Sequence, residues 1–158
     1  MIHAVAYILF ILPFTAWLGH ELKRPYILYK HWGWLAGAFT TGIVGAVLSY
    51  VYDDKFGNFL LHASGGFASC LLYIYLLKTL KLRFTWSLTI VLLFGFVSAL
   101  GVLNELFEYA YELLHLGTMS FDTHDTWRDF VANTTGAIFA WMLYRVVILA
   151  RRSFAHKR

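Results

Sequence analysis

Long apolar stretches alternate with short polar segments along the whole chain. Each stretch is close to the ~20 residues that an α-helix needs to cross the hydrocarbon core of a bilayer. The pattern therefore predicts an all-α fold, a polytopic transmembrane helical bundle of about five spans. Because no repeat or linker divides the chain, residues 1–158 are expected to form a single transmembrane helical domain. The apolar stretches cover residues 2–19, 32–52, 59–77, 85–108 and 129–150.

Composition agrees with this membrane assignment. Only 14% of the 158 residues are charged and 59% are apolar, whereas a soluble domain has about 25% charged and about 45–50% apolar residues. These values exclude a disordered chain, and no nucleic-acid partner is expected. The single cysteine, Cys70, excludes an intrachain disulfide and a zinc site built from cysteines. The first stretch has no basic segment before it and is expected to be a retained helix rather than a signal peptide.

Charged residues are sorted by sign between alternate connections. Eleven of the 13 basic residues lie in segments that five spans would place on one side of the membrane, and eight of the 9 acidic residues lie on the other. Short basic connections normally face the cytoplasm. The sequence therefore predicts a multi-pass protein of the inner (cytoplasmic) membrane with its N-terminus outside and its C-terminus cytoplasmic. The basic residues of these segments are Lys23, Arg24, Lys30, Lys78, Lys81, Arg83, Arg145, Arg151, Arg152, Lys157 and Arg158.

Small residues recur at helical spacing on several of the predicted spans. Gly65 and Gly66 belong to the third stretch, Gly95 to the fourth, and Gly136 and Ala137 to the last. Small side chains let helix backbones approach each other closely in a membrane. These stripes predict the packing seams of the bundle.

Polar residues gather in one layer across three of the predicted spans, near the side expected to be outside. His62 lies about one turn inside the third stretch, Glu105 and Glu108 close the fourth, and Asp129 and Asn133 open the last. Glu105 and Glu108 are three residues apart, so their carboxylates share one helix face. Ionisable groups inside a membrane are costly and normally face partners in the bundle interior. The layer therefore predicts a functional site.

The acidic residues of this layer allow more than one interpretation. Glu105 and Glu108 could be solvated in the headgroup region, could pair with Arg128, or could bind a cation or share a proton. Asp122 and Asp125 precede the last stretch. They could cap the N-terminus of its helix, where acidic side chains are favoured by the helix dipole.

The ligand types define the expected cofactor. Carboxylate and amide oxygens without cysteine suit a divalent cation such as Mg²⁺ or Ca²⁺. A histidine ligand, His62 or His124, would extend the choice to Zn²⁺ or Mn²⁺. The metal ligands predicted from the sequence are Glu105, Glu108, Asp125, Asp129 and Asn133.

A catalytic site in this layer would need a base and a group that holds the substrate. His62 could act as general base or nucleophile, or it could be a buried histidine hydrogen-bonded to a neighbouring helix. Arg128 could hold a phosphate or a lipid headgroup, or it could anchor its helix at the interface. The predicted catalytic residues are His62, Glu105, Glu108 and Asp129, and the predicted substrate-binding residues are Arg128, His124 and Asp122.

Three segments resemble the VanZ-like family of small membrane proteins. In DTHDTWRDFVANTTGA (122–137), Asp129, Asn133 and the following Gly-Ala match the family's last helix. In NELFEYAYELL (104–114), Glu105 matches and Glu108 stands where the family has Gln. DDKFGNFLLHASGG (53–66) resembles an earlier element that ends in a His. The Glu-x-x-Glu pair is more similar to the related YjdF-like group of inner-membrane proteins, which implies no known activity. The VanZ-like resemblance implies a link to resistance against teicoplanin-type glycopeptides.

Two classes of function are compatible with these residues. The first is metal-dependent processing of a cell-envelope lipid or lipid-linked phosphate, since a bound cation can activate water and neutralise phosphoryl charge. The second is a non-catalytic protein that binds a cation, a cationic ligand or a partner protein, or provides a proton or cation pathway. Membrane lipids are the expected partners in both cases. Whether the chain is an enzyme and whether it forms a homo-oligomer stay open.

Overall fold

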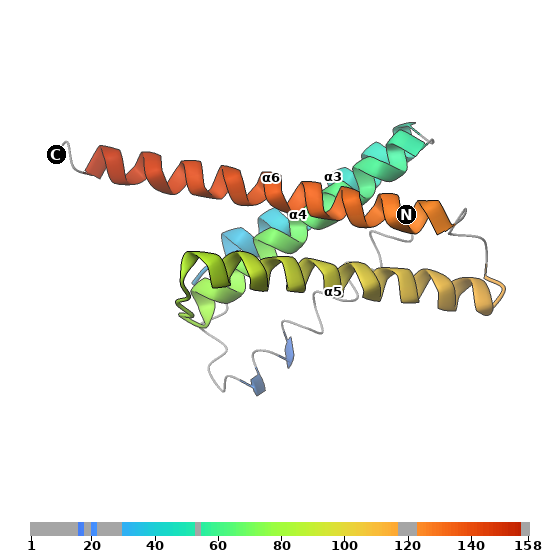
Figure 1. Ribbon diagram of the computed structural model, residues 1–158, viewed down its shortest axis with the longest axis horizontal. Helices are drawn as coiled ribbons and strands as arrows, with labels where there is room; N and C mark the ends of the chain where they lie inside the picture. The colour runs from blue at the N-terminus through green and yellow to red at the C-terminus, as the bar shows by residue number, and fades with distance from the viewer. Residues whose placement is uncertain (1–15, 18–19, 22–29, 53–54, 117–122, 156–158) are drawn as a thin grey trace.

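A computed structural model describes most of the chain. It covers residues 16–17, 20–21, 30–52, 55–116 and 123–155. In these ranges all long elements are α-helices, and four of them are long and apolar enough to cross a membrane. The helices are α3 (Trp32–Tyr52), α4 (Lys55–Thr79), α5 (Trp86–Leu113) and α6 (Thr123–Ala155) (Figure 1).

The all-helical prediction is confirmed for these four candidate spans. The expected first span, residues 2–19, lies almost entirely outside the described residues. The number of five spans and the sides on which the two termini lie therefore stay predictions.

Three helices extend beyond the apolar stretches that predicted them. Helix α4 begins at Lys55 rather than 59, α5 continues to Leu113 rather than 108, and α6 begins at Thr123 rather than 129. Hydropathy identifies the part of a helix that suits hydrocarbon, whereas backbone hydrogen bonds continue the helix through polar turns. As a result, Asp125 and Asp129 lie on the same continuous helix.

Helix α4 is the centre of the bundle. Its most apolar part is 61% buried, against 17–28% for the other three helices. Helices α3 and α6 pack extensively along it, whereas α5 makes much smaller contacts with α4 and α6. Figure 1 shows α3 and α4 running together and crossing α6 obliquely, with α5 alongside α6.

Helices α4 and α6 cross at backbone contact. A Cβ atom at Gly66 would collide with the backbone oxygen of Asn133, and one at Gly136 would collide with the backbone oxygen of Ala63. This reciprocal contact confirms the small-residue seams predicted for these two helices. By contrast, a Cβ at Gly95 would meet no atom within 4 Å, so that glycine is not part of a seam between the described helices.

The core of the bundle is apolar, and the outer faces of its helices are apolar too. Buried residues from α4, α5 and α6 form one cluster. Exposed valines such as Val91, Val131 and Val146, between 61% and 65% exposed, cover the outside of α5 and α6. Such faces suit lipid rather than water. The buried members of the cluster are Cys70, Tyr73, Ile74, Leu93, Val97, Ala137, Ala140 and Trp141.

Candidate functional site

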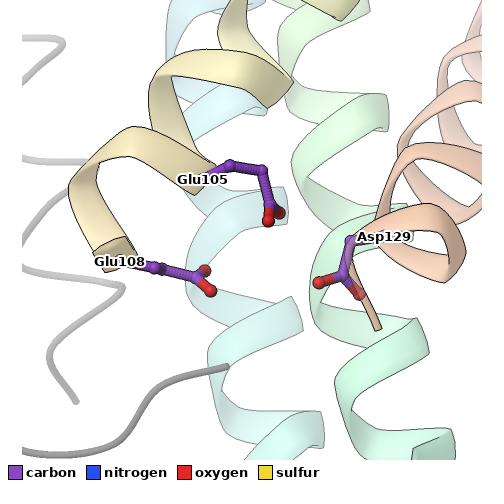
Figure 2. A group of neighbouring side chains, drawn as sticks. All are labelled: Glu105, Glu108 and Asp129. Carbon is purple, nitrogen blue, oxygen red and sulfur yellow. The ribbon is translucent and has the colours of Figure 1, made fainter. Parts of the chain in front are cut away.

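Three carboxylates from two helices meet inside the bundle. Glu105 and Glu108 come from α5 and Asp129 from α6, and one oxygen of each lies within 4.8 Å of the others. Figure 2 shows the two glutamates pointing from α5 toward Asp129. Glu108 and Asp129 are buried, with 4% and 3% of their surface exposed, and Glu105 is half-buried. The carboxylates of Glu105 and Glu108 therefore lie on the same face, as their spacing predicts.

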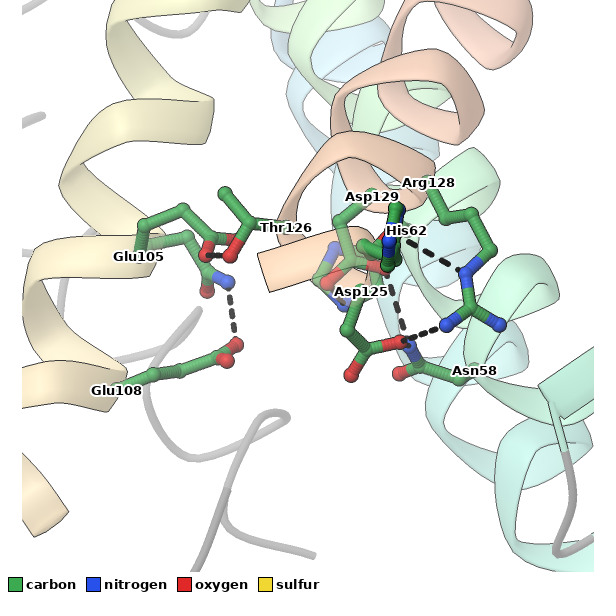
Figure 3. Close-up of polar contacts among 10 residues, drawn as sticks. Asn58, His62, Glu105, Glu108, Asp125, Thr126, Arg128 and Asp129 are labelled. Atoms are coloured by element: carbon green, nitrogen blue, oxygen red, sulfur yellow. Dashed lines mark hydrogen bonds and ion pairs between the residues drawn. The ribbon is translucent and has the colours of Figure 1, made fainter. Parts of the chain in front are cut away.

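Asp129 is also held by two residues of α4. The His62 Nε2 atom lies 3.3 Å from one carboxylate oxygen, and the Asn58 amide donates a hydrogen bond of 3.0 Å to the other (Figure 3). Asn58 and His62 are four residues apart, so both side chains leave the same side of α4. Because His62 is itself buried, the contact provides Asp129 with a partner where water does not reach freely.

Each glutamate accepts a hydrogen bond from a neutral side chain. The Asn104 amide donates to Glu108 over 2.6 Å, within the same helix. The Thr126 hydroxyl of α6 donates to Glu105 over 2.9 Å, across the α5–α6 interface. These donors orient both carboxylates. Because the donors are neutral, they do not compensate the negative charge of an ionised carboxylate.

Arg128 and Asp125 lie beside this cluster rather than within it. Arg128 Nη2 is 3.7 Å from the Asp125 carboxylate, and its Nε donates to the backbone oxygen of His124. The Asn58 amide lies 3.5 Å from the same Asp125 oxygen. Asn58 therefore joins the Arg128–Asp125 pair to Asp129, and Figure 3 shows these contacts linking α6 to α4.

Charge decides what the cluster can do chemically. Carboxylates a few ångströms apart in a medium of low dielectric constant repel one another strongly when all are ionised. The hydrogen-bond donors reduce this repulsion but bring no positive charge. A bound cation or a retained proton removes it. The arrangement can therefore bind a cation or hold protons.

The structure brings most of the predicted site residues together. The predicted catalytic residues form the centre: His62, Glu105, Glu108 and Asp129. Asn133 lies one turn further along α6, with its backbone oxygen against Gly66. His124 is exposed and lines a surface groove with Arg128. Asp122 lies outside the described residues.

Sequence reasoning did not identify the hydrogen-bond donors of the site. Asn58, Asn104 and Thr126 all donate to its carboxylates. The available signal was spacing, because Asn58 and Asn104 each lie four residues before a predicted site residue. Neutral polar residues near a helix end are common in membrane proteins, which made this signal weak.

The fold and site define a class: an α-helical membrane protein with a buried carboxylate cluster between its spans. The chain belongs to the family described as "Predicted membrane protein (DUF2238)", whose model matches residues 1–150. No curated protein and no solved structure matches the chain. Membership of this family supports the assignment as a membrane protein. The resemblance to VanZ-like and YjdF-like proteins stays a prediction.

Proposed function

We propose that the protein binds a divalent cation at its carboxylate cluster and processes a cell-envelope lipid or lipid-linked phosphate. The observation that supports this most is the convergence of Glu105, Glu108 and Asp129 within 4.8 Å. Hard oxygen ligands favour Mg²⁺, Mn²⁺ or Ca²⁺. With the His62 imidazole as a further ligand, Zn²⁺ becomes suitable. Asp125 and Asn133, one turn to either side of Asp129 on α6, are the further oxygen ligands in this proposal.

The remaining residues supply the other parts of a phosphate-processing site. His62, paired with Asp129 at 3.3 Å, is oriented as a general base, since a carboxylate partner fixes the orientation of the imidazole ring. Arg128 and His124 hold the substrate phosphate in this proposal, and Asp122, also predicted from the sequence to bind substrate, lies outside the described residues. The resemblance to VanZ-like proteins, which are linked to glycopeptide resistance, supports an envelope substrate. Charge sorting supports a site that opens on the outer side of the inner membrane.

Cation binding can be tested before a substrate is known. The protein is purified, treated with a chelator, and titrated with Mg²⁺, Mn²⁺, Ca²⁺ and Zn²⁺ by calorimetry. We expect one ion per chain, with at least about tenfold weaker binding in Glu105→Gln and Asp129→Asn, because each loses a charged ligand worth about 1.4 kcal/mol or more. Glu112→Gln is the matched control, since it makes the same change one turn beyond Glu108 on α5.

Two results would reject the cation site. One is the absence of any titratable ion in the wild type, and the other is equal affinity in Asp129→Asn and Glu112→Gln. Turnover is then tested with vesicles that contain a radiolabelled lipid phosphate. Release of labelled phosphate by the wild type but not by His62→Gln supports the reaction, and equal release by both rejects the role of His62.

Burial of the site favours a second candidate, a cation-binding protein without catalysis. Glu108 and Asp129 are almost inaccessible to solvent, which suits a tightly held ion better than a substrate that must enter and leave. A conducting path has less support, because the core is apolar further along α4 and α5, where Ile74 and Val97 are buried. Liposome flux separates the cases: ion flux without change in lipid composition would favour conduction over both alternatives.

A further inference from the structure

A surface groove lies beside the carboxylate cluster, where α4 and α6 begin. It is lined by Phe59 of α4 and by His124, Trp127, Arg128 and Val131 of α6. Its volume is about 340 Å³, at the lower end of the ~300–1,000 Å³ that ligand pockets occupy. All three apolar side chains are exposed, Trp127 and Val131 by more than 60%.

Arg128 brings a guanidinium to this groove, where it is paired with Asp125. Its side chain is 43% exposed, and its guanidinium is oriented by the backbone oxygen of His124 at 3.2 Å and by Asp125 at 3.7 Å. A guanidinium held in this way is preorganised for a phosphate, because its planar donors match two phosphate oxygens. His124, exposed on the preceding turn, brings a second nitrogen-bearing side chain to the same edge.

We propose that this groove binds a phospholipid, with the headgroup phosphate at Arg128 and His124 and one acyl chain against Phe59, Trp127 and Val131. Charge complementarity favours this occupant, since a largely apolar groove beside a guanidinium matches an acyl chain that carries a phosphate at its end. Tryptophan beside it is typical of the membrane interface. A second helix fits less well, because helices dock on small residues in membranes and these walls are bulky.

This inference rests on the proposed function for one step, the identity of this lipid as the substrate. The groove and the cluster are connected: Arg128 contacts Asp125, and Asn58 contacts both Asp125 and Asp129. A phosphate bound at Arg128 would therefore lie next to the residues proposed to hold the cation. Binding of the lipid itself needs no cation and can be measured alone.

Native mass spectrometry in detergent micelles measures this binding, with dioleoylphosphatidylglycerol as the probe. We expect the wild type to retain one phosphatidylglycerol molecule at collision energies that remove all other bound lipid molecules. Val131→Trp, which fills the groove, should weaken this binding by at least about tenfold. The matched control is Val146→Trp, because Val146 lies on the same helix, 62% exposed against 61% for Val131, and is expected to leave the lipid bound.

The headgroup contact has its own pair of variants. Arg128→Gln should weaken phosphatidylglycerol binding about tenfold, because the lipid phosphate loses a charge-assisted hydrogen bond. Arg145→Gln, at the other end of α6, should leave it unchanged. Dioleoylglycerol, which lacks the phosphate, and glycerol phosphate, which lacks the chains, should each bind at least tenfold more weakly than the complete lipid.

Three outcomes would overturn the proposal. They are equal lipid retention in Val131→Trp and Val146→Trp, equal retention in Arg128→Gln and Arg145→Gln, or glycerol phosphate binding as well as the lipid. Cation binding is measured on the same wild-type samples. Lipid retention without any cation binding would reject the proposed function and support the groove, whereas cation binding without lipid retention would reject the groove alone.

Discussion

The two halves of α6 differ in how they accommodate charged side chains. Near its start, Asp129 is buried among His62, Asn58 and the two glutamates. In its second half, cations lie over aromatic rings: Arg145 is 4.4 Å from the Trp86 ring centre, and Lys78 of α4 is 5.6 Å from that of Tyr144. Long basic side chains can reach the membrane surface while their stems stay in apolar surroundings. Carboxylates are too short for this, so they need partners inside the bundle.

The aromatic half of α6 therefore has a structural explanation. Trp141 and Tyr144 pack at 5.3 Å between ring centres, and Trp34 and Trp86 contact them at 5.4 Å and 5.9 Å. Such clusters anchor helices at a membrane interface. Packing and anchoring do not explain three carboxylates with oxygens within 4.8 Å of one another. We therefore expect one half of α6 to anchor the bundle at the membrane interface and the other half to bind the proposed cation.

The largest loss of stability is expected where α4 and α6 cross. The contact between His62 of α4 and Asp129 of α6 forms only while these two helices are packed together. Gly136→Ala places a Cβ against the Ala63 backbone oxygen, and the helices must separate. We expect a loss of about 3 kcal/mol in the free energy of unfolding, measured in mixed micelles. Gly95→Ala is the control: its Cβ meets open space, and the better helix propensity of alanine should stabilise by up to ~1 kcal/mol. Equal stability of the two variants would contradict the close crossing.

An intermediate effect is expected at the polar half. His62→Phe keeps a ring of similar size but leaves the buried Asp129 without its imidazole partner. We expect a loss of about 2 kcal/mol, since a buried polar group deprived of its partner costs ~1–3 kcal/mol. A double-mutant cycle with Asp129→Asn supplies the control. The double variant should lose less than the sum of the single variants, and strict additivity would show that the two side chains do not interact.

The smallest effect is expected at the aromatic half. Arg145→Gln removes the charge above Trp86, and a cation–π contact at an exposed site contributes about 0.5–1 kcal/mol. Thermal unfolding at high and low salt measures the difference, which should decrease as salt increases. If Arg145→Gln lost as much stability as His62→Phe, the two halves of α6 would not differ in the way described.

Sequence patterns predicted the helices better than their ends. Residues 32–52 were predicted and observed without change, because polar residues bound that stretch on both sides. The start of α6 was placed six residues too late, because THDTWR (123–128) is largely polar although it is helical. Hydropathy reports where a helix enters hydrocarbon, and in α6 that point lies beyond the first turns.

For the site, ionisable residues were predictable and their partners were not. His62, Glu105, Glu108 and Asp129 stand out because charge inside apolar spans is costly. Thr126 does not stand out, and its bond to Glu105 depends on how α5 lies against α6. The small-residue seams were likewise visible on each helix alone. That Gly66 meets α6 follows only from the three-dimensional arrangement.

The backbone contact between α4 and α6 also limits how the carboxylate cluster can open. These two helices pack backbone to backbone, and they supply His62 and Asp129. Glu105 and Glu108 come from α5, which is packed far less extensively against either helix. An ion bound by residues of both α5 and α6 would hold α5 against the packed pair of α4 and α6. Occupancy and docking of α5 would then be thermodynamically linked, so that whatever loosens the helix also releases the ion.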